Sequence, residues 1–269
     1  MRLATYNVCN LFLAGEGLTK PGKALRPLRK MVGNVGADVW LLQEVGSLQT
    51  LQIFNESLED PFPELALLPG NSDRSIHLGV LSRVPVTVTS HHQTLLVDEE
   101  GEPLLGYMSQ QAAQAGKMSE LKVLRDFLEV DLGWMKLYGV HLKSQAQSNW
   151  QTLDAEILRR AEVRALVHLL QARVGTSPYA VLGDFNDVAE ADVFDALDAL
   201  ELSDLHAELF TRLGRRPSTY WPKRRARLDR ILLCQQTRAM ADPGSALIHA
   251  GGMGRQASDH FPVSIDLDI

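Results

Sequence analysis

Short apolar runs recur along the whole chain and predict many β-strands. Each run has the length of a strand, and turn-forming or polar residues separate it from the next. The runs occupy residues 2–8, 37–45, 77–84, 126–132, 134–142, 179–185, 228–233 and 262–269.

Three segments between these runs show the spacing of amphipathic helices. The first apolar stripe consists of Leu25, Leu28, Val32 and Val35. A second, longer helix is indicated by Leu153, Ile157, Leu166, Leu169 and Leu170. We expect Arg159, Arg160 and Glu162 on the solvent face of that helix, and residues 192–200 predict a third.

Strands and helices alternate evenly from one end of the chain to the other. No Pro/Ser-rich linker, repeat or low-complexity segment interrupts them, so residues 1–269 are expected to form a single α/β domain. Residues 98–119, which are polar and rich in Gly and Gln, predict a long surface loop. Basic residues gather around Tyr220 and Trp221 between positions 212 and 227. Such a cluster is usually a solvated face, but it also suits a phosphate backbone and a stacked base.

Composition and charge narrow the function classes. The chain is 45% hydrophobic and 22% charged, as in ordinary globular proteins, and its net charge is −6. No global basic field therefore indicates a nucleic-acid binder, and an anionic substrate would need a local positive site or a metal.

The cysteines and the absence of long apolar stretches suggest a cellular setting. Cys9 and Cys234 lie far apart and form no metal-ligand or disulfide pattern, so reduced thiols are expected. The N-terminal residues lack the apolar core of a signal peptide, and no stretch approaches the about 18 apolar residues of a membrane span. We expect a soluble, cytoplasmic, monomeric protein.

Acid, amide and imidazole side chains follow the ends of several predicted strands. They are Asn7, Glu44, His141, Asp184, Asn186, Asp229, Asp259 and His260. Because functional groups of α/β proteins gather where strands end and loops begin, these residues are expected to lie together.

These residue types suit phosphate-ester hydrolysis. The oxygens of Glu44, Asp259 and Asn7 are hard ligands of the kind that Mg²⁺ prefers. A histidine can exchange a proton or donate to a phosphate oxygen near neutral pH, and Asp229 can orient such a histidine. Structural alternatives stay open, because GDFN also forms turns, a lone histidine is often a satisfied core residue, and Asp229 can pair with its arginine neighbours.

Six ordered motifs carry a family resemblance. TYNVCNLF, LLQEV, YGVHLKS, LGDFND, RLDRILL and ASDHFPV, between about residues 3 and 265, resemble the endonuclease/exonuclease/phosphatase superfamily, whose fold is deoxyribonuclease-I-like. The resemblance implies a four-layer α/β sandwich, in which two mostly antiparallel sheets pack face to face with helices outside. It also implies a site at one edge of that sandwich.

The resemblance assigns a metal site to matching positions. It implies that Glu44 is the principal ligand of Mg²⁺, or of Mn²⁺, with Asn7 and Asp259 assisting.

The resemblance also assigns catalytic roles. His260 would be the general base or would bind the scissile phosphate, with Asp229 orienting it, and Asp184 and Asn186 would position the nucleophile and the phosphate. In addition, His141 and Arg125 would contact the phosphate. The family pattern leaves open whether Asp184 or His260 activates water.

Three positions depart from particular branches of the family. Cys9 stands where some abasic-site endonucleases carry an acidic residue, and His141 stands where they usually have tyrosine. Residues 227–230 read Arg-Leu-Asp-Arg instead of the Trp-Cys-Asp-Arg typical of phosphoinositide phosphatases. The bacterial nuclease-like members are the better match.

The expected function is a Mg²⁺-dependent phosphoesterase that hydrolyses phosphodiester bonds, with DNA or RNA as its substrate. A phosphatase acting on a small phosphorylated metabolite or a lipid head group is the alternative, and the acidic net charge favours it mildly. A catalytically inactive binding module is the third possibility, and the intact set of polar residues argues against it.

Overall fold

The strands form two sheets. The computed structural model describes residues 1–13, 20–71, 74–94, 122–146, 155–188, 190–214, 218–221 and 226–269. In the first sheet the strand order is β10 (Leu247–Ile248), β11 (Val263–Asp266), β1 (Arg2–Leu11), β2 (Val39–Val45), β4 (His77–Ser82) and β3 (Glu64–Leu68). In the second it is β5 (Thr87–Thr89), β6 (Phe127–Asp131), β7 (Lys136–His141), β8 (Tyr179–Asp184) and β9 (Asp229–Leu233).

Most strand pairs are antiparallel, as expected. The exceptions are β1 with β2 and β7 with β8, one parallel pair in each sheet. Leu41 and Val80 of the first sheet pack with Leu128 and Leu182 of the second in one buried cluster. The inner faces of the two sheets therefore form the central core.

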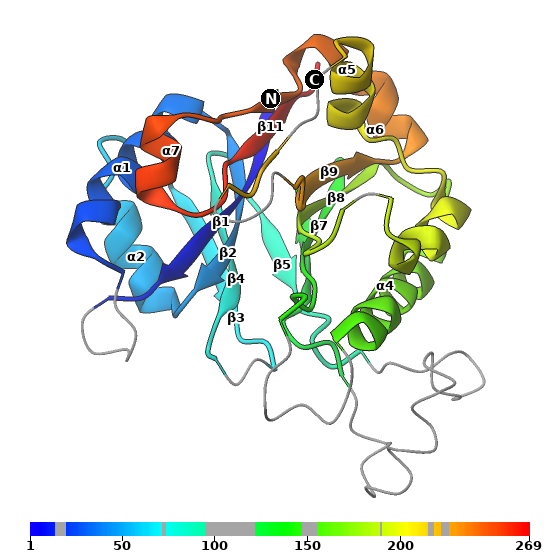
Figure 1. Ribbon diagram of the computed structural model, residues 1–269, viewed down its shortest axis with the longest axis horizontal. Coiled ribbons are helices and arrows are strands. Elements are labelled where there is room, and N and C mark those ends of the chain that lie inside the picture. Colours follow the sequence, from blue (N-terminus) through cyan, green and yellow to red (C-terminus); the bar gives the residue numbers. More distant parts are fainter. Residues whose placement is uncertain are drawn as a thin grey trace, which may run out of the picture.

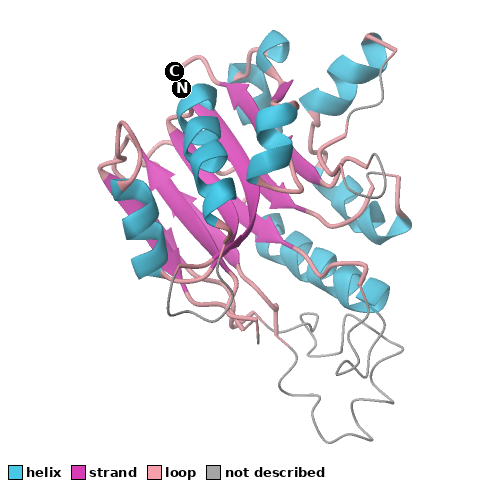
Figure 2. Ribbon diagram, turned by 60° about the vertical axis from the view of Figure 1, so that its left-hand side comes forward, coloured by secondary structure: helices cyan, strands magenta, loops and turns pink. Residues whose placement is uncertain are grey.

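Helices cover both outer faces of the sheets (Figures 1 and 2). On the first sheet lie α1 (Gly22–Val35), α2 (Leu48–Glu56) and α7 (Gly252–Ala257), and on the second lie α4 (Ala155–Gln171) and the 3₁₀ helix η2 (Asp192–Leu200). The remaining helical elements in the described part of the chain are α5 (Leu205–Arg212), α6 (Gln235–Met240) and η3 (Pro243–Ser245). The two termini lie side by side (Figure 1). The predicted four-layer α/β sandwich is confirmed.

The eight predicted strands and three predicted helices are present wherever the chain is described. In α1, Leu28, Val32 and Val35 are buried and Leu25 is half-buried. Leu153, the predicted loop at 98–119 and most of the basic cluster at 212–227 fall outside the described residues. No helix in the described part of the chain is long and apolar enough to cross a membrane.

The prediction for the solvent face of α4 was wrong for two of its three residues. Arg159 and Glu162 are 3% and 1% exposed, whereas Arg160 is half-buried. Buried charges are stable only when they find partners, and the partners of both residues lie on loops beside the site described below.

Candidate active site

A pocket of about 250 Å³ opens at one edge of the sandwich. With one exception, every predicted site residue lines it: Asn7, Glu44, Arg125, His141, Asp184, Asn186, Asp259 and His260. The exception, Asp229, lies behind His260. A larger cavity of about 820 Å³, over α1 and the segment after α2, contains none of these residues.

The two parallel strand pairs explain why these residues meet. Asn7 and Glu44 lie toward the C-terminal ends of β1 and β2, and His141 and Asp184 are the last residues of β7 and β8. The C-terminal ends of a parallel pair lie at the same edge of a sheet, where loops begin. Each sheet therefore contributes one such pair to the pocket.

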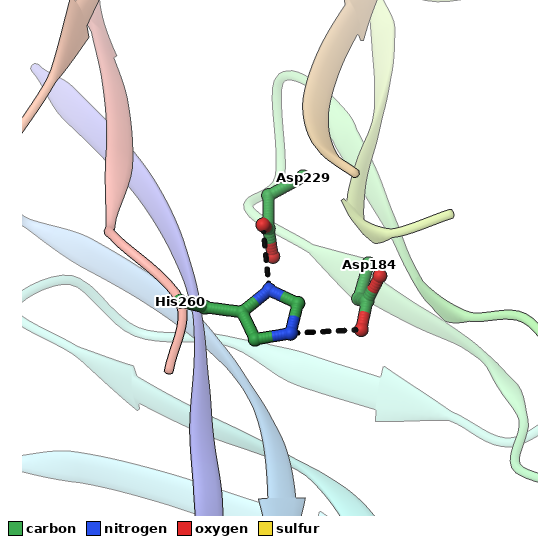
Figure 3. Close-up of side chains that lie close together, drawn as sticks. All are labelled: Asp184, Asp229 and His260. Atoms are coloured by element: carbon green, nitrogen blue, oxygen red, sulfur yellow. Dashed lines mark hydrogen bonds and ion pairs between the residues drawn. The ribbon is translucent and has the colours of Figure 1, made fainter. Parts of the chain in front are cut away.

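His260 lies between two carboxylates (Figure 3). Its Nδ1 is 2.8 Å from Asp229 Oδ2, and its Nε2 is 3.9 Å from Asp184 Oδ2. Asp184 and Asp229 are directly opposite each other on β8 and β9, so the sheet itself sets their separation. All three side chains are buried. The alternative pairing of Asp229 is wrong: Arg227 pairs with Asp204, and Arg230 donates to the backbone oxygen of Asp187.

Burial and charge strongly perturb this cluster. Burial opposes the imidazolium form of His260, but the carboxylates of Asp229 and Asp184 outweigh it and raise the pKa of His260 to about 10. Burial also raises the pKa of the Asp184 carboxyl; the His260 imidazolium opposes that rise and Asp229 adds to it. The His260 ring is therefore held in its charged form between the side chains of Asp229 and Asp184.

Asp184 is the centre of the hydrogen-bonded network. Its Oδ2 accepts from Asn7 Nδ2 at 2.9 Å and lies 3.6 Å from His141 Nε2. Its Oδ1 accepts from the backbone N–H of Asn186 at 2.9 Å. Burial, together with the charges of Arg125 and His260, lowers the pKa of His141 well below its usual value. His141 therefore faces Asp184 as a neutral ring.

The backbone of GDFND explains its residue types. Gly183 has φ 149°, and a Cβ there would lie 1.9 Å from the backbone oxygen of Val140, so only glycine fits. Asn186 adopts φ 56°, a left-handed conformation that Asn tolerates well. Its Nδ2 donates to the oxygen of Leu142 at 2.9 Å. The segment is both a turn and the bearer of pocket side chains.

Three further pocket side chains offer oxygens that suit a divalent cation. Glu44, at φ 65°, accepts the backbone N–H of Asn10 at 2.9 Å, and Asn7 Oδ1 accepts that of Cys9 at 3.0 Å. With Asp259, they offer the hard oxygens that Mg²⁺ prefers.

Asp184, Asp229 and His260 form a tighter group, with potential ligand atoms within 4.8 Å of one another. However, His260 and Asp229 already bond each other. The assignment of the metal to Glu44, Asn7 and Asp259 stays a prediction from the family resemblance.

Glu162 of α4 fastens two loops that reach the pocket. One carboxylate oxygen accepts the backbone N–H of Leu124 at 3.2 Å, and the other accepts that of Lys143 at 2.7 Å. Leu124 precedes the pocket residue Arg125, and Lys143 precedes the pocket residue Ser144. Arg125 Nη1 in turn donates to the backbone oxygen of Leu142 at 3.0 Å.

Arg159 connects the same region to GDFND. It donates to the backbone oxygen of Lys143 at 3.0 Å and pairs with Asp187, the last residue of the motif. Asp187 also accepts from Gln145, at 2.7 Å. The sequence does contain a signal for the burial of Glu162. This residue continues the apolar stripe of Leu166 and Leu170 at four-residue spacing, and the prediction overlooked it.

The pocket also contains residues outside the predicted catalytic set, of which only Tyr220 was noted in the sequence, beside the basic cluster. Arg74, Gln145 and Tyr220 line it, and the ring of Tyr220 lies 5.0 Å from that of His260, centroid to centroid. All three belong to loops, where no periodic pattern indicates direction.

A family model provides independent identification. The model described as "Endonuclease/Exonuclease/phosphatase family" matches residues 4–260. The chain belongs to this family. Members of the endonuclease/exonuclease/phosphatase superfamily are metal-dependent phosphoesterases, and the pocket of this member combines hard oxygen ligands with an acid–histidine network.

Solved structures share the fold of this family member at low sequence identity. An AP endonuclease from Archaeoglobus fulgidus superposes with a TM-score of 0.65 at 13% identity, covering 100% of both chains. The 3′ phosphatase NExo from Neisseria, bound to product DNA hairpin, gives 0.63 at 15%, again over 100% of both. The human Nocturnin catalytic domain gives 0.61 at 15%, covering 98% of this chain and 93% of that one. No curated protein matches the sequence.

Proposed function

We propose that the protein is a Mg²⁺-dependent phosphodiesterase that cleaves nucleic acid. The observation that carries the proposal is the shared pocket, in which the Asp229–His260–Asp184 network faces the oxygens of Glu44, Asn7 and Asp259. This arrangement combines a base, its orienting acid and hard metal ligands within one small volume.

The protein groups divide the work of phosphodiester hydrolysis. Asp184 and Asn186 orient the attacking water. Asp184 accepts the water proton when the His260 ring is charged, and His260 Nε2 can accept it only in the neutral form of the ring. Asp229 holds the His260 ring through Nδ1. Glu44, Asn7 and Asp259 would hold a divalent cation, which would neutralise charge on the phosphate and on the leaving oxygen.

Two further groups bind the phosphate in this scheme. His141, as a neutral ring, donates one N–H to a phosphate oxygen, and Arg125 supplies a fixed positive charge beside it. Arg125 is 6% exposed, and its Nε has no hydrogen-bond partner among the described residues. An orphaned donor at a pocket wall is costly unless a ligand satisfies it.

The structural neighbours support a nucleic-acid substrate. One is described as an AP endonuclease, and NExo is described both as a 3′-5′ exonuclease and as a 3′ phosphatase bound to product DNA hairpin. The phosphatase description supports a second candidate function, the hydrolysis of a phosphomonoester. An inactive binding module is disfavoured because the predicted set of polar residues is complete.

Hydrolysis assays test the proposal. Single- and double-stranded DNA, RNA, bis-p-nitrophenyl phosphate and a panel of phosphomonoesters are incubated with the protein in Mg²⁺ or in EDTA. The His260→Ala variant controls for contaminating nucleases. Polynucleotide cleavage that needs Mg²⁺ and is lost in the variant is expected. Turnover of monoesters only would replace the proposal with a small-molecule phosphatase.

A further inference from the structure

The pocket is too small to enclose a nucleotide and its neighbours. Its volume of about 250 Å³ lies below the about 300–1,000 Å³ of pockets that surround small-molecule ligands. It therefore accepts a phosphate and the atoms next to it, and the rest of a phosphodiester substrate must lie against the rim.

Trp221 is directly bonded to residues that line the pocket. The preceding residue, Tyr220, lines the pocket, and the backbone N–H of Trp221 donates to the oxygen of Asp259, another pocket residue, at 3.2 Å. Its indole N–H donates to the backbone oxygen of Ser258 at 3.0 Å. Both ends of the residue are therefore fixed to the Ser258–His260 segment.

The indole is exposed despite this anchoring. Trp221 is 40% exposed, and its N–H edge is held by the hydrogen bond to Ser258. A solvent-exposed tryptophan whose N–H is fixed by a hydrogen bond is unusual, because burial of this side chain is strongly favourable. Trp134, 36% exposed in the turn between β6 and β7, is the other large exposed aromatic in the described part of the chain. It lies at the opposite end of β7 from His141.

We propose that Trp221 is a stacking platform for the nucleobase next to the scissile phosphate. This inference rests on the proposed function and adds a substrate class to it: phosphodiesters that carry a base are bound in preference to base-free ones. Aromatic side chains stack on any base, so the platform confers preference for nucleotides without sequence specificity.

Paired binding probes test this role. Fluorescence anisotropy measures the Kd of a single-stranded oligonucleotide and of a strand of equal length that carries abasic sites throughout, both in EDTA to prevent cleavage. The wild-type protein is expected to bind the base-bearing strand more tightly, and Trp221→Ala to reduce that preference by about tenfold. Trp221→Phe keeps a ring and retains part of the preference, and Trp134→Ala leaves it unchanged.

Two results overturn the inference. One is equal binding of the two strands by the wild-type protein, and the other is an unchanged preference in a folded Trp221→Ala variant. If Trp221→Ala fails to fold, the same criterion applies to Trp221→Leu. The proposed function is tested separately by Mg²⁺-dependent cleavage. If the wild-type protein cuts an oligonucleotide but binds the two strands equally, the stacking role of Trp221 is refuted and the proposed phosphodiesterase activity still holds.

Discussion

Glu162 offers a sharp test of how the pocket is held in place. Glu162→Gln preserves the size of the side chain but replaces one of two accepting oxygens by an NH₂ group. In the wild type, each oxygen receives a backbone N–H, from Leu124 and from Lys143. In the variant, one N–H must face another donor, and Arg125 loses a nearby compensating charge. The two loops should therefore separate slightly at the pocket wall.

The size of the effect follows from these two contacts. A hydrogen bond to a charged group contributes about 1.5–3 kcal/mol, and a buried donor without a partner costs about 1–3 kcal/mol. We expect a loss of about 3 kcal/mol in the free energy of unfolding, or about 6–12 °C in melting temperature. Activity should fall further than stability suggests, because a displacement of about 1 Å can cost a hundredfold in rate.

The assay separates positioning from plain stability. Calorimetry gives the melting temperature, and kcat and KM for the best substrate are measured well below it. Leu170→Ala is the matched control, because Leu170 is fully buried on the same helix, about 12 Å along its axis from Glu162, and should cost about 2–5 kcal/mol. Glu162→Gln should lose kcat while Leu170→Ala keeps it. Equal activity losses in the two variants would refute a positioning role for Glu162.

Three further predictions concern the site and its surroundings. Asp184→Asn should lower kcat at least about a hundredfold with an unchanged circular dichroism spectrum; full activity would contradict its assignment. Mg²⁺ at about 100 times its Kd should stabilise the protein by about 2.7 kcal/mol, and thermal melts should show this shift lost in Glu44→Gln but kept in wild type. Burial tends to raise the pKa of Glu129, but hydrogen bonds from Lys136 and His91 outweigh it and lower the pKa. The stability from this carboxylate is present above its ordinary pKa and is lost on acidification, so Glu129→Gln should flatten the acid limb of urea-unfolding midpoints against pH.

The central strands were predictable because burial on both faces leaves a continuous apolar run. β2 and β8 are buried along nearly their whole length, and both were predicted closely. The missed strands are edge or short elements. β3 and β5 lie at the edges of their sheets and are mostly exposed or half-buried, and β10 has two residues. Such strands are specified by their neighbours and carry little local pattern.

The site was predictable to the extent that it lies at strand ends. Asn7, Glu44, His141 and Asp184 were found because each follows an apolar run, and the parallel pairing of the strands brings them together. The family resemblance predicted that Asp229 pairs with His260, and the structure has this pair. Local sequence alone would not give it, because Arg227 and Arg230 lie within two positions of Asp229 and His260 lies 31 positions away.

The buried charges of α4 show what a helical pattern cannot report. Periodicity identifies which face of a helix is apolar, but it does not indicate where a polar partner lies beneath that face. Arg159 and Glu162 lie there because the backbone of Lys143 offers both an acceptor and a donor, and Asp187 offers a charge. These contacts join GDFND to the loop after β7, so that two walls of the pocket depend on one helix. Changes in α4 should therefore alter catalysis without touching a reacting group.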